Sequence, residues 1–172
     1  MTNQEAISLI SKGIPQGSKP QKWADLGCGG GTFTVALATI LPFGSQIVAV
    51  DKSMQQLEKT MGNGVSVNFI QADFEQIDLE LTDLDGILLA NSLHYVKDKI
   101  TLIQRLEKYL ITDKRFLIVE YDTLSANKWV PYPIDFIRLE ELFADLNYRS
   151  VVKLSERKSL YGRGNLYAAA II

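Results

Sequence analysis

The chain has 172 residues, of which 47% are hydrophobic and 22% are charged, and its formal net charge is -2 at pH 7. This length suits one domain, residues 1–172, and the composition is that of a globular protein with a core rather than a disordered chain. A chain without a basic excess is not typical of proteins that hold nucleic acid by its phosphates, so we expect no nucleic-acid partner. With one cysteine (Cys28) and one histidine, an internal disulfide or a multi-cysteine zinc site is excluded, and we expect no metal.

The beginning of the sequence, MTNQEAISLISKG, has no basic start and its apolar positions are interrupted, so it does not have the pattern of a signal peptide. No apolar run reaches the roughly 18–20 residues that a membrane-spanning helix needs. We therefore expect a protein of a reducing compartment, most simply the cytoplasm, with no membrane association.

The first half of the chain alternates between helical and strand patterns. The predicted elements are a short amphipathic helix around residues 6–10 that Gly13 and Pro15 end, a strand at 22–26, a helix at 32–41, a strand at 46–50, a helix at 54–61 capped by Ser53 and ended by GNG, and a strand at 65–71.

The second half continues the alternation and ends in two strands. Its predicted elements are a strand at 84–90, a helix at 98–110 capped by Asp98, a strand at 116–121, a helix at 135–146, and strands at 151–155 and 166–172. The turn-rich sequence YGRGN joins the last two strands, and Arg163 within it is either an exposed turn residue or an anion-binding arginine.

This order predicts an α/β fold, with a doubly wound, mostly parallel, seven-stranded sheet and helices on both faces. The last two strands are too close in sequence for a parallel crossover, so one strand near the C-terminus should be antiparallel. In such sheets ligands bind at the carboxyl ends of the strands, where the strand order reverses.

The first strand runs directly into a glycine-rich turn, Asp25-Leu26-Gly27-Cys28-Gly29-Gly30-Gly31. Between a strand and a helix, such a turn lets backbone lie against a ligand and directs helix amides at it. The dinucleotide pattern GxGxxG would need a third glycine at 32 or 34, where threonines stand. Cys28 is more simply a small filler than a nucleophile, because no partner that would lower its pKa is evident.

Further polar residues follow the next strands: Asp51, then Asp73-Phe74, then Asn91-Ser92-Leu93-His94. Together with the glycine turn, these blocks resemble the successive motifs of the class I S-adenosylmethionine-dependent methyltransferases, over about residues 22–121. Acids at three strand ends suit a cationic, hydroxyl-rich ligand and would repel a pyrophosphate.

The resemblance implies S-adenosylmethionine as cofactor and assigns its contacts. At the methionine end, the glycines Gly27, Gly29 and Gly31 would pack against the cofactor, Asp25 would help to hold its ammonium through water, and the Asn91 carbonyl would face it. Asp51 would bind the ribose hydroxyls. Met54 would lie on the adenine, and Asp73 and the Phe74 backbone would bind the adenine edge. Simpler interpretations remain: Asp51 as a helix cap, Asp73 as a loop acid and Met54 as a core residue.

His94 follows the fourth central strand and is the candidate general base for the methyl acceptor; its simpler interpretation is a structural or pocket-lining residue. Tyr121, Trp129 and Tyr132 offer flat apolar faces and are candidate substrate-binding residues, unless they pack in the core beneath a long connection. Residues 1–21 form a candidate partial lid. The sequence Asn91-Ser92-Leu93-His94 departs from the Asn/Asp-Pro-Pro-Tyr pattern of methyltransferases that act on nucleobase or glutamine amino groups.

We therefore predict a methyltransferase that acts on a small-molecule acceptor. Two alternatives remain open: a S-adenosylmethionine-binding module without catalysis, and a small nicotinamide-dependent oxidoreductase.

Overall fold

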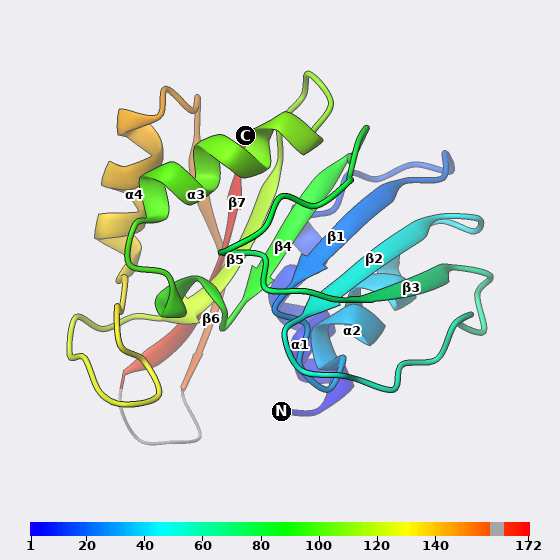
Figure 1. Cartoon of the computed structure of the whole chain (residues 1–172), viewed down its shortest axis with the longest axis horizontal. Coiled ribbons are helices and arrows are strands. Elements are labelled where there is room, and N and C mark those ends of the chain that lie inside the picture. Colours follow the sequence, from blue (N-terminus) through cyan, green and yellow to red (C-terminus); the bar gives the residue numbers. More distant parts are fainter. Residues whose placement is uncertain (159–163) are drawn as a thin grey trace.

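The computed structural model describes residues 1–158 and 164–172, in which helices are layered on a β-sheet (Figure 1). The helices are α1 (Asn3–Ile10), α2 (Thr32–Ile40), α3 (Lys99–Leu106) and α4 (Phe136–Asp145), with 3-10 turns at Ser11–Gly13, Leu93–Tyr95 and Glu107–Tyr109. The strands are β1 (Lys22–Leu26), β2 (Gln46–Asp51), β3 (Ser66–Gln71), β4 (Gly86–Ala90), β5 (Phe116–Tyr121), β6 (Val151–Lys158) and β7 (Asn165–Ile171). Arg163 lies outside the described residues.

The seven strands form one sheet in the order β3-β2-β1-β4-β5-β7-β6. Strand β7 is antiparallel to both β5 and β6, whereas the pairs among β1 to β5 are all parallel. This confirms the predicted doubly wound sheet with one antiparallel strand near the C-terminus. The strand order reverses between β1 and β4. These two strands are parallel neighbours, so their carboxyl ends lie at the same edge of the sheet.

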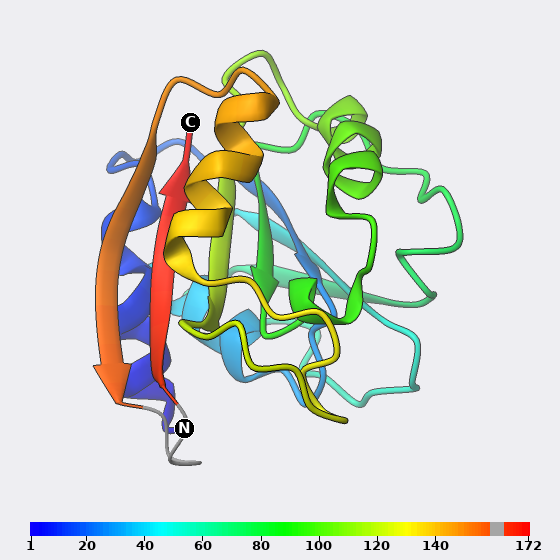
Figure 2. The ribbon, with the colours of Figure 1, turned by 90° about the vertical axis from the view of Figure 1, so that its left-hand side faces the viewer.

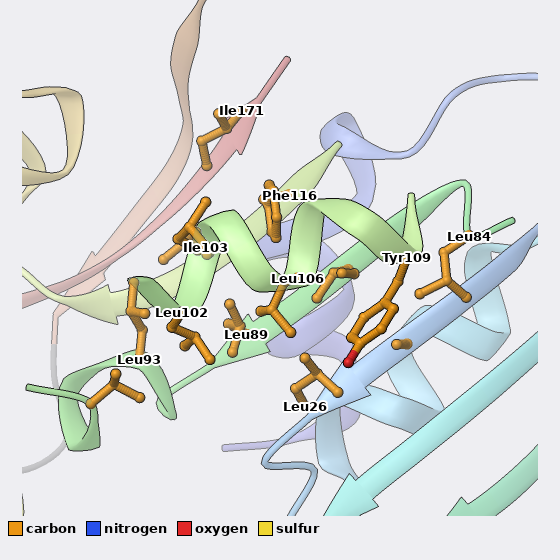
Figure 3. Close-up of a cluster of buried hydrophobic side chains, with 14 of the residues drawn as sticks. Leu26, Leu84, Leu89, Leu93, Leu102, Ile103, Leu106, Tyr109, Phe116 and Ile171 are labelled. Atoms are coloured by element: carbon orange, nitrogen blue, oxygen red, sulfur yellow. The ribbon is translucent and has the colours of Figure 1, made fainter. Parts of the chain in front are cut away.

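Helices cover both faces of the sheet, as predicted (Figures 1 and 2). One buried cluster lies between the sheet and helices α3 and α4, on what we call the α3/α4 face. Figure 3 shows Leu102, Ile103 and Leu106 of α3 over the strands. A second cluster fills the α1/α2 face, where Leu9 and Ile10 of α1 are buried. Successive residues of β1 alternate between these two clusters, which is the pattern of a strand covered on both sides.

The predicted cap of α3 is confirmed, and α4 has a cap of the same kind that was not predicted. The Asp98 carboxylate accepts from the Thr101 N–H at 3.0 Å, and the Asp135 carboxylate accepts from the Arg138 N–H at 2.8 Å. Helix α3 is shorter than expected, because it tightens into a 3-10 turn at Glu107–Tyr109.

The helix predicted at 54–61 with Ser53 as its cap is wrong. The segment is irregular, and its end pairs with the beginning of β3: Val67 N–H donates to Lys59 O at 2.9 Å and Met61 N–H donates to Val65 O at 2.9 Å. A helix of eight residues has little stability of its own, and the open edge of β3 offers these backbone groups better partners.

Among the described residues no helix is long and apolar enough to cross a membrane. The same residues contain no group of three or more histidine, cysteine, aspartate or glutamate side chains placed to hold a metal ion.

Candidate functional site

A pocket of about 360 Å³ lies at the carboxyl edge of the sheet, beside the point where the strand order reverses. It brings together four of the predicted residues: Gly27, Gly29, Asn91 and Tyr121. The remaining lining residues are Met1, Cys28, Thr32, Phe33, Ala90, Arg157, Lys158 and Leu166. The glycine turn and the end of β4 therefore form two sides of the pocket, and β5, β6 and β7 contribute the far side.

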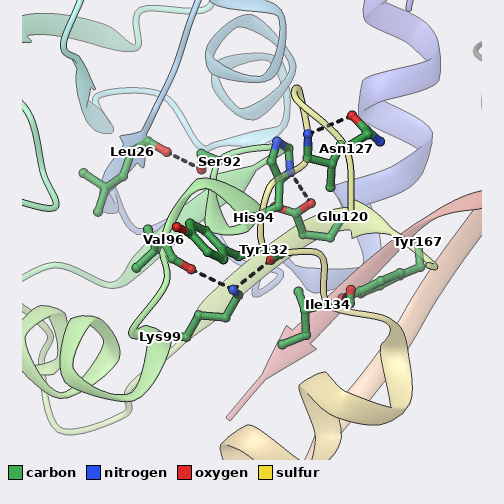
Figure 4. A network of polar contacts seen from close by, with 11 residues as sticks. Leu26, Ser92, His94, Val96, Lys99, Glu120, Asn127, Tyr132, Ile134 and Tyr167 are labelled. Atoms are coloured by element: carbon green, nitrogen blue, oxygen red, sulfur yellow. Dashed lines mark hydrogen bonds and ion pairs between the residues drawn. The ribbon is translucent and has the colours of Figure 1, made fainter. Parts of the chain in front are cut away.

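The glycine turn has a conformation that its sequence makes possible. Gly27 has φ of 78°, and a Cβ placed there would lie 2.5 Å from the Cβ of Ser92. Ser92 in turn donates from its hydroxyl to the carbonyl of Leu26 at 2.7 Å, so the ends of β1 and β4 are tied together at this glycine (Figure 4). By contrast, a Cβ at Gly29 would meet nothing within 4 Å, so the turn faces open space there.

Asp25 is buried beneath this turn, at 1% exposure. Its Oδ2 accepts a hydrogen bond of 2.6 Å from the Thr34 hydroxyl, and its Oδ1 has no hydrogen-bond partner among the described residues. Burial raises the pKa of Asp25 to about 7, the Thr34 hydrogen bond opposes this, and the negative charge of Asp51 adds to it. A buried carboxylate with one unpaired oxygen is the arrangement that an ammonium group, directly or through water, would complete.

Asp51 links the end of β2 to the glycine turn. One carboxylate oxygen accepts from the Gly29 N–H at 2.9 Å and the other from the Ser53 N–H at 2.8 Å. It caps no helix, and each oxygen keeps a lone pair for a further donor.

The segment after β3 is held by a cation from α3. Asp73 accepts from the Glu75 N–H at 3.0 Å, and the Arg105 guanidinium donates to the carbonyls of Phe74 and Glu75. Met54 is 68% exposed, so its interpretation as a core residue is wrong. Met54, Asp73 and Phe74 lie outside the lining of the pocket described above.

Asn91 is strained in the way that functional residues often are. Its φ is 54°, and its backbone N–H donates to Val119 O at 2.8 Å. The side-chain Oδ1 is buried with no hydrogen-bond partner among the described residues. Asp25 Oδ1 and Asn91 Oδ1 are therefore two buried oxygens that can each accept a hydrogen bond from a ligand.

His94 forms a buried pair with Glu120, which the sequence analysis missed (Figure 4). His94 Nδ1 lies 2.7 Å from Glu120 Oε2, and the His94 backbone N–H donates to Glu120 Oε1 at 3.1 Å. The two side chains are 3% and 1% exposed. A charged residue in the otherwise apolar strand Phe116–Tyr121 was the available signal.

The structure places His94 beside the pocket rather than in its lining. Because strand residues alternate, Glu120 points to the α3/α4 face and Tyr121 to the pocket side. The rings of His94 and Tyr121 have centroids 6.1 Å apart.

Of the other aromatic candidates, Trp129 is 66% and Tyr132 is 41% exposed, so packing in the core is wrong for both. The Tyr132 N–H donates to His94 O at 2.9 Å, and Lys99 Nζ donates to the carbonyls of Val96 and Tyr132 (Figure 4). These contacts hold the loop before α4 against the turn that carries His94.

Comparison with known proteins gives the family. The family described as "Methyltransferase domain" matches residues 18–160. The chain belongs to this methyltransferase family. The match confirms the predicted family and favours it over the nicotinamide-dependent alternative.

Similar solved structures agree with this fold. One is the 1,6-didemethyltoxoflavin N1-methyltransferase of Burkholderia thailandensis, with a TM-score of 0.71 and 20% identity over 98% of this chain and 77% of that chain. Another is a S-adenosylmethionine-dependent methyltransferase of Leishmania major, with a TM-score of 0.71 and 17% identity over 98% and 70%. A third is phosphoethanolamine N-methyltransferase 2 of Haemonchus contortus, with a TM-score of 0.73 and 14% identity over 98% of this chain and 52% of that chain. No curated protein sequence matches the chain significantly.

Proposed function

We propose that this methyltransferase binds S-adenosylmethionine across the carboxyl edge of its sheet and methylates a small-molecule acceptor. The observation that carries the proposal is the pocket in which the glycine turn meets Asn91, with unpaired buried oxygens on Asp25 and Asn91 beside it. A positively charged ligand with several hydrogen-bond donors would satisfy these oxygens, whereas a phosphate would not.

The chain's residues fit each part of this cofactor. At the methionine end, the glycines Gly27, Gly29 and Gly31 leave room for the ligand, Asp25 supplies a counter-charge for its ammonium, and the Asn91 carbonyl provides an acceptor. For the ribose, Asp51 keeps lone pairs for the two hydroxyls. For the adenine, Met54 offers an exposed apolar side chain, and Asp73 and the Phe74 backbone offer polar groups to the edge of the ring. When bound, S-adenosylmethionine supplies a methyl group already activated by its sulfonium, so the protein's main task is to position an acceptor in line with it.

Several features favour a small acceptor. The structurally similar protein of B. thailandensis holds 1,6-didemethyltoxoflavin, and that of H. contortus holds phosphomonomethylethanolamine. Tyr121 lines the pocket here, and the exposed rings of Trp129 and Tyr132 stand on the loop that follows β5. These three side chains are our proposed acceptor contacts, and residues 1–21, of which Met1 reaches the pocket, are our proposed partial lid.

His94 is our proposed general base where the acceptor must lose a proton. The Glu120 carboxylate can only accept, so it fixes the neutral imidazole with its proton on Nδ1 and leaves the Nε2 lone pair available. The base would be held in the correct tautomer by a buried partner, as a catalytic histidine requires.

The decisive experiment is incubation with methyl-labelled S-adenosylmethionine and fractionated metabolites, followed by identification of the labelled product. We expect label in a low-molecular-weight product, with none when Gly29 is replaced by a bulky residue. Cofactor binding in calorimetry with no labelled product from any fraction would instead establish a binding module. A melting temperature raised by NAD and not by S-adenosylhomocysteine would refute the cofactor assignment.

A further inference from the structure

The far side of the pocket carries positive charge that the cofactor contacts above do not use. Arg157 and Lys158, the last two residues of β6, both line it. The acids Asp25 and Asp51 lie on the opposite side, beneath and behind the glycine turn. The acids therefore lie behind one wall of the pocket, the glycine turn, and the two cations line the opposite wall.

The strand register shows which of the two cations is directed into the pocket. Tyr121 of β5 pairs with Leu166 of β7, and Leu166 pairs with Arg157 of β6. Paired residues project on the same face of a sheet, so these three side chains form one row, and all three line the pocket. Lys158 also borders the pocket, but as the next residue it projects on the opposite face of the sheet from this row.

Arg157 has an ionic partner in the described chain, but not a complete set of hydrogen bonds. Its Nη1 lies 2.9 Å from Oε2 of Glu5 on α1. Nη1 is buried, and apart from this ion pair it has no hydrogen-bond partner among the described residues. Glu5 is shared, because its Oε2 also accepts from the Thr2 N–H at 2.8 Å in the capping box of α1. Figure 2 shows the beginning of α1 at the same edge of the molecule as the end of β6.

A second donor group faces the same pocket. Helix α2 begins at Thr32, a lining residue, and its N-cap is Gly31, which has no side chain to accept from the first-turn amides. Within the described residues no side chain caps these N–H groups, and together with the helix dipole they favour an anion at this end of the helix. A guanidinium and a helix N-terminus thus converge on one space.

We propose that Arg157 binds the α-carboxylate of the cofactor's methionine part, and that Glu5 competes with this carboxylate for the guanidinium. The inference rests on the proposed function, because it places the carboxylate of that cofactor. It divides the zwitterionic end of the ligand between the two sides of the pocket: the ammonium goes to Asp25 and Asn91, and the carboxylate goes to Arg157 and the α2 N-terminus. Arg157 is suited to this role because its planar group presents several donors to one carboxylate.

The test compares two ligands by calorimetry. One is S-adenosylhomocysteine; the other is 5′-deoxy-5′-(3-aminopropylthio)adenosine, which keeps the nucleoside, thioether and amine but lacks the carboxylate. For Arg157→Ala we expect S-adenosylhomocysteine to bind roughly 10–100-fold more weakly, with the amine ligand changed less than twofold. Arg157→Lys should lie between Arg157→Ala and the unmodified protein.

Glu5→Gln separates this proposal from a purely structural ion pair. The glutamine keeps an oxygen for the Thr2 N–H but frees Arg157, so we expect S-adenosylhomocysteine to bind severalfold more tightly. If the ion pair served only to hold α1 on β6, Glu5→Gln and Arg157→Ala would weaken binding alike, and that result would overturn the proposal. Arg138→Ala, which removes an exposed α4 ion pair with Glu141, is the matched control and should change neither affinity.

Two further outcomes are informative. If Arg157→Ala weakens both ligands equally, or weakens neither, the carboxylate assignment is wrong, and in the second case the guanidinium is left for an anionic acceptor. If the unmodified protein binds neither ligand, the proposed function itself is wrong. Melting temperatures of all variants show whether any loss of binding reflects loss of fold.

Discussion

The buried carboxyl of Asp25 should make the stability of the unliganded protein fall as the pH rises toward neutrality. Burial raises its pKa to about 7 from an ordinary 3.8, so between these values the native state holds a proton that the unfolded chain has lost. Stability from this group is complete below the unfolded pKa and is lost as the pH rises through the folded one. From about pH 5 to about pH 8 the linkage amounts to a loss of about 2.6 kcal/mol of unfolding free energy.

Urea denaturation across this pH range, on the protein and on Asp25→Asn, measures the effect. The asparagine is neutral throughout, and its oxygen can still accept from Thr34. Any cost of burying the asparagine amide is the same at every pH, so the comparison depends only on how the unfolding free energy changes with pH. We expect the slope to be lost in Asp25→Asn; a slope retained in full would show that another group carries it.

The same substitution should have the opposite effect on ligand binding. If Asp25 holds the cofactor's ammonium, the bound ligand stabilises the carboxylate, and affinity for S-adenosylhomocysteine should rise with pH toward about 7 in the unmodified protein only. A site that sacrifices stability for binding in this way is expected where a charge is buried for function. Equal pH dependence of binding in both proteins would remove Asp25 from the ligand contacts.

Three further predictions follow from the geometry of the site. Gly27→Ala should cost about 2–4 kcal/mol in urea denaturation, because its Cβ meets Ser92 at a positive φ, whereas Gly29→Ala should cost about 1 kcal/mol and chiefly weaken ligand binding in calorimetry. Asp51→Ala should weaken S-adenosylhomocysteine binding by about 1–3 kcal/mol; unchanged affinity would contradict the ribose assignment. Glu120→Gln should lower kcat about 10²-fold or more and shift the pH–rate profile with cofactor affinity unchanged, because its amide reverses the His94 tautomer; an unaltered profile would remove the base hypothesis.

The sequence was sufficient to predict the residues at the ends of the central strands. Each is adjacent in sequence to a strongly apolar strand, and parallel strands must end at one edge, so Asp25, Asp51 and Asn91 meet there without any knowledge of side-chain contacts. The prediction of an antiparallel β7 had the same basis, because the short connection leaves no room for a crossover.

The predictions that failed depended on local propensity alone. Residues 54–61 have a cap and a helix-compatible composition, but they lie beside the exposed edge of β3, and pairing with that edge decided their conformation. The exposure of Trp129 and Tyr132 was likewise beyond prediction, since it depends on how the loop before α4 is fastened to the His94 turn.

The pairs His94–Glu120 and Glu5–Arg157 could not be predicted, because each joins distant segments through the register of the sheet. Glu120 and Tyr121 are neighbours in sequence, yet alternation sends one to the α3/α4 face and the other to the pocket. Arg157 reaches the pocket only because β7 lies between β5 and β6 and aligns Tyr121, Leu166 and Arg157 in one row. A shift of one residue in the β6–β7 pairing would place either Lys158 or Glu156 in that row, and Glu156 would reverse the charge of the far side of the pocket. The register of the antiparallel strand β7 therefore determines that Arg157, and not the acidic Glu156, lies in the row of side chains that lines the pocket.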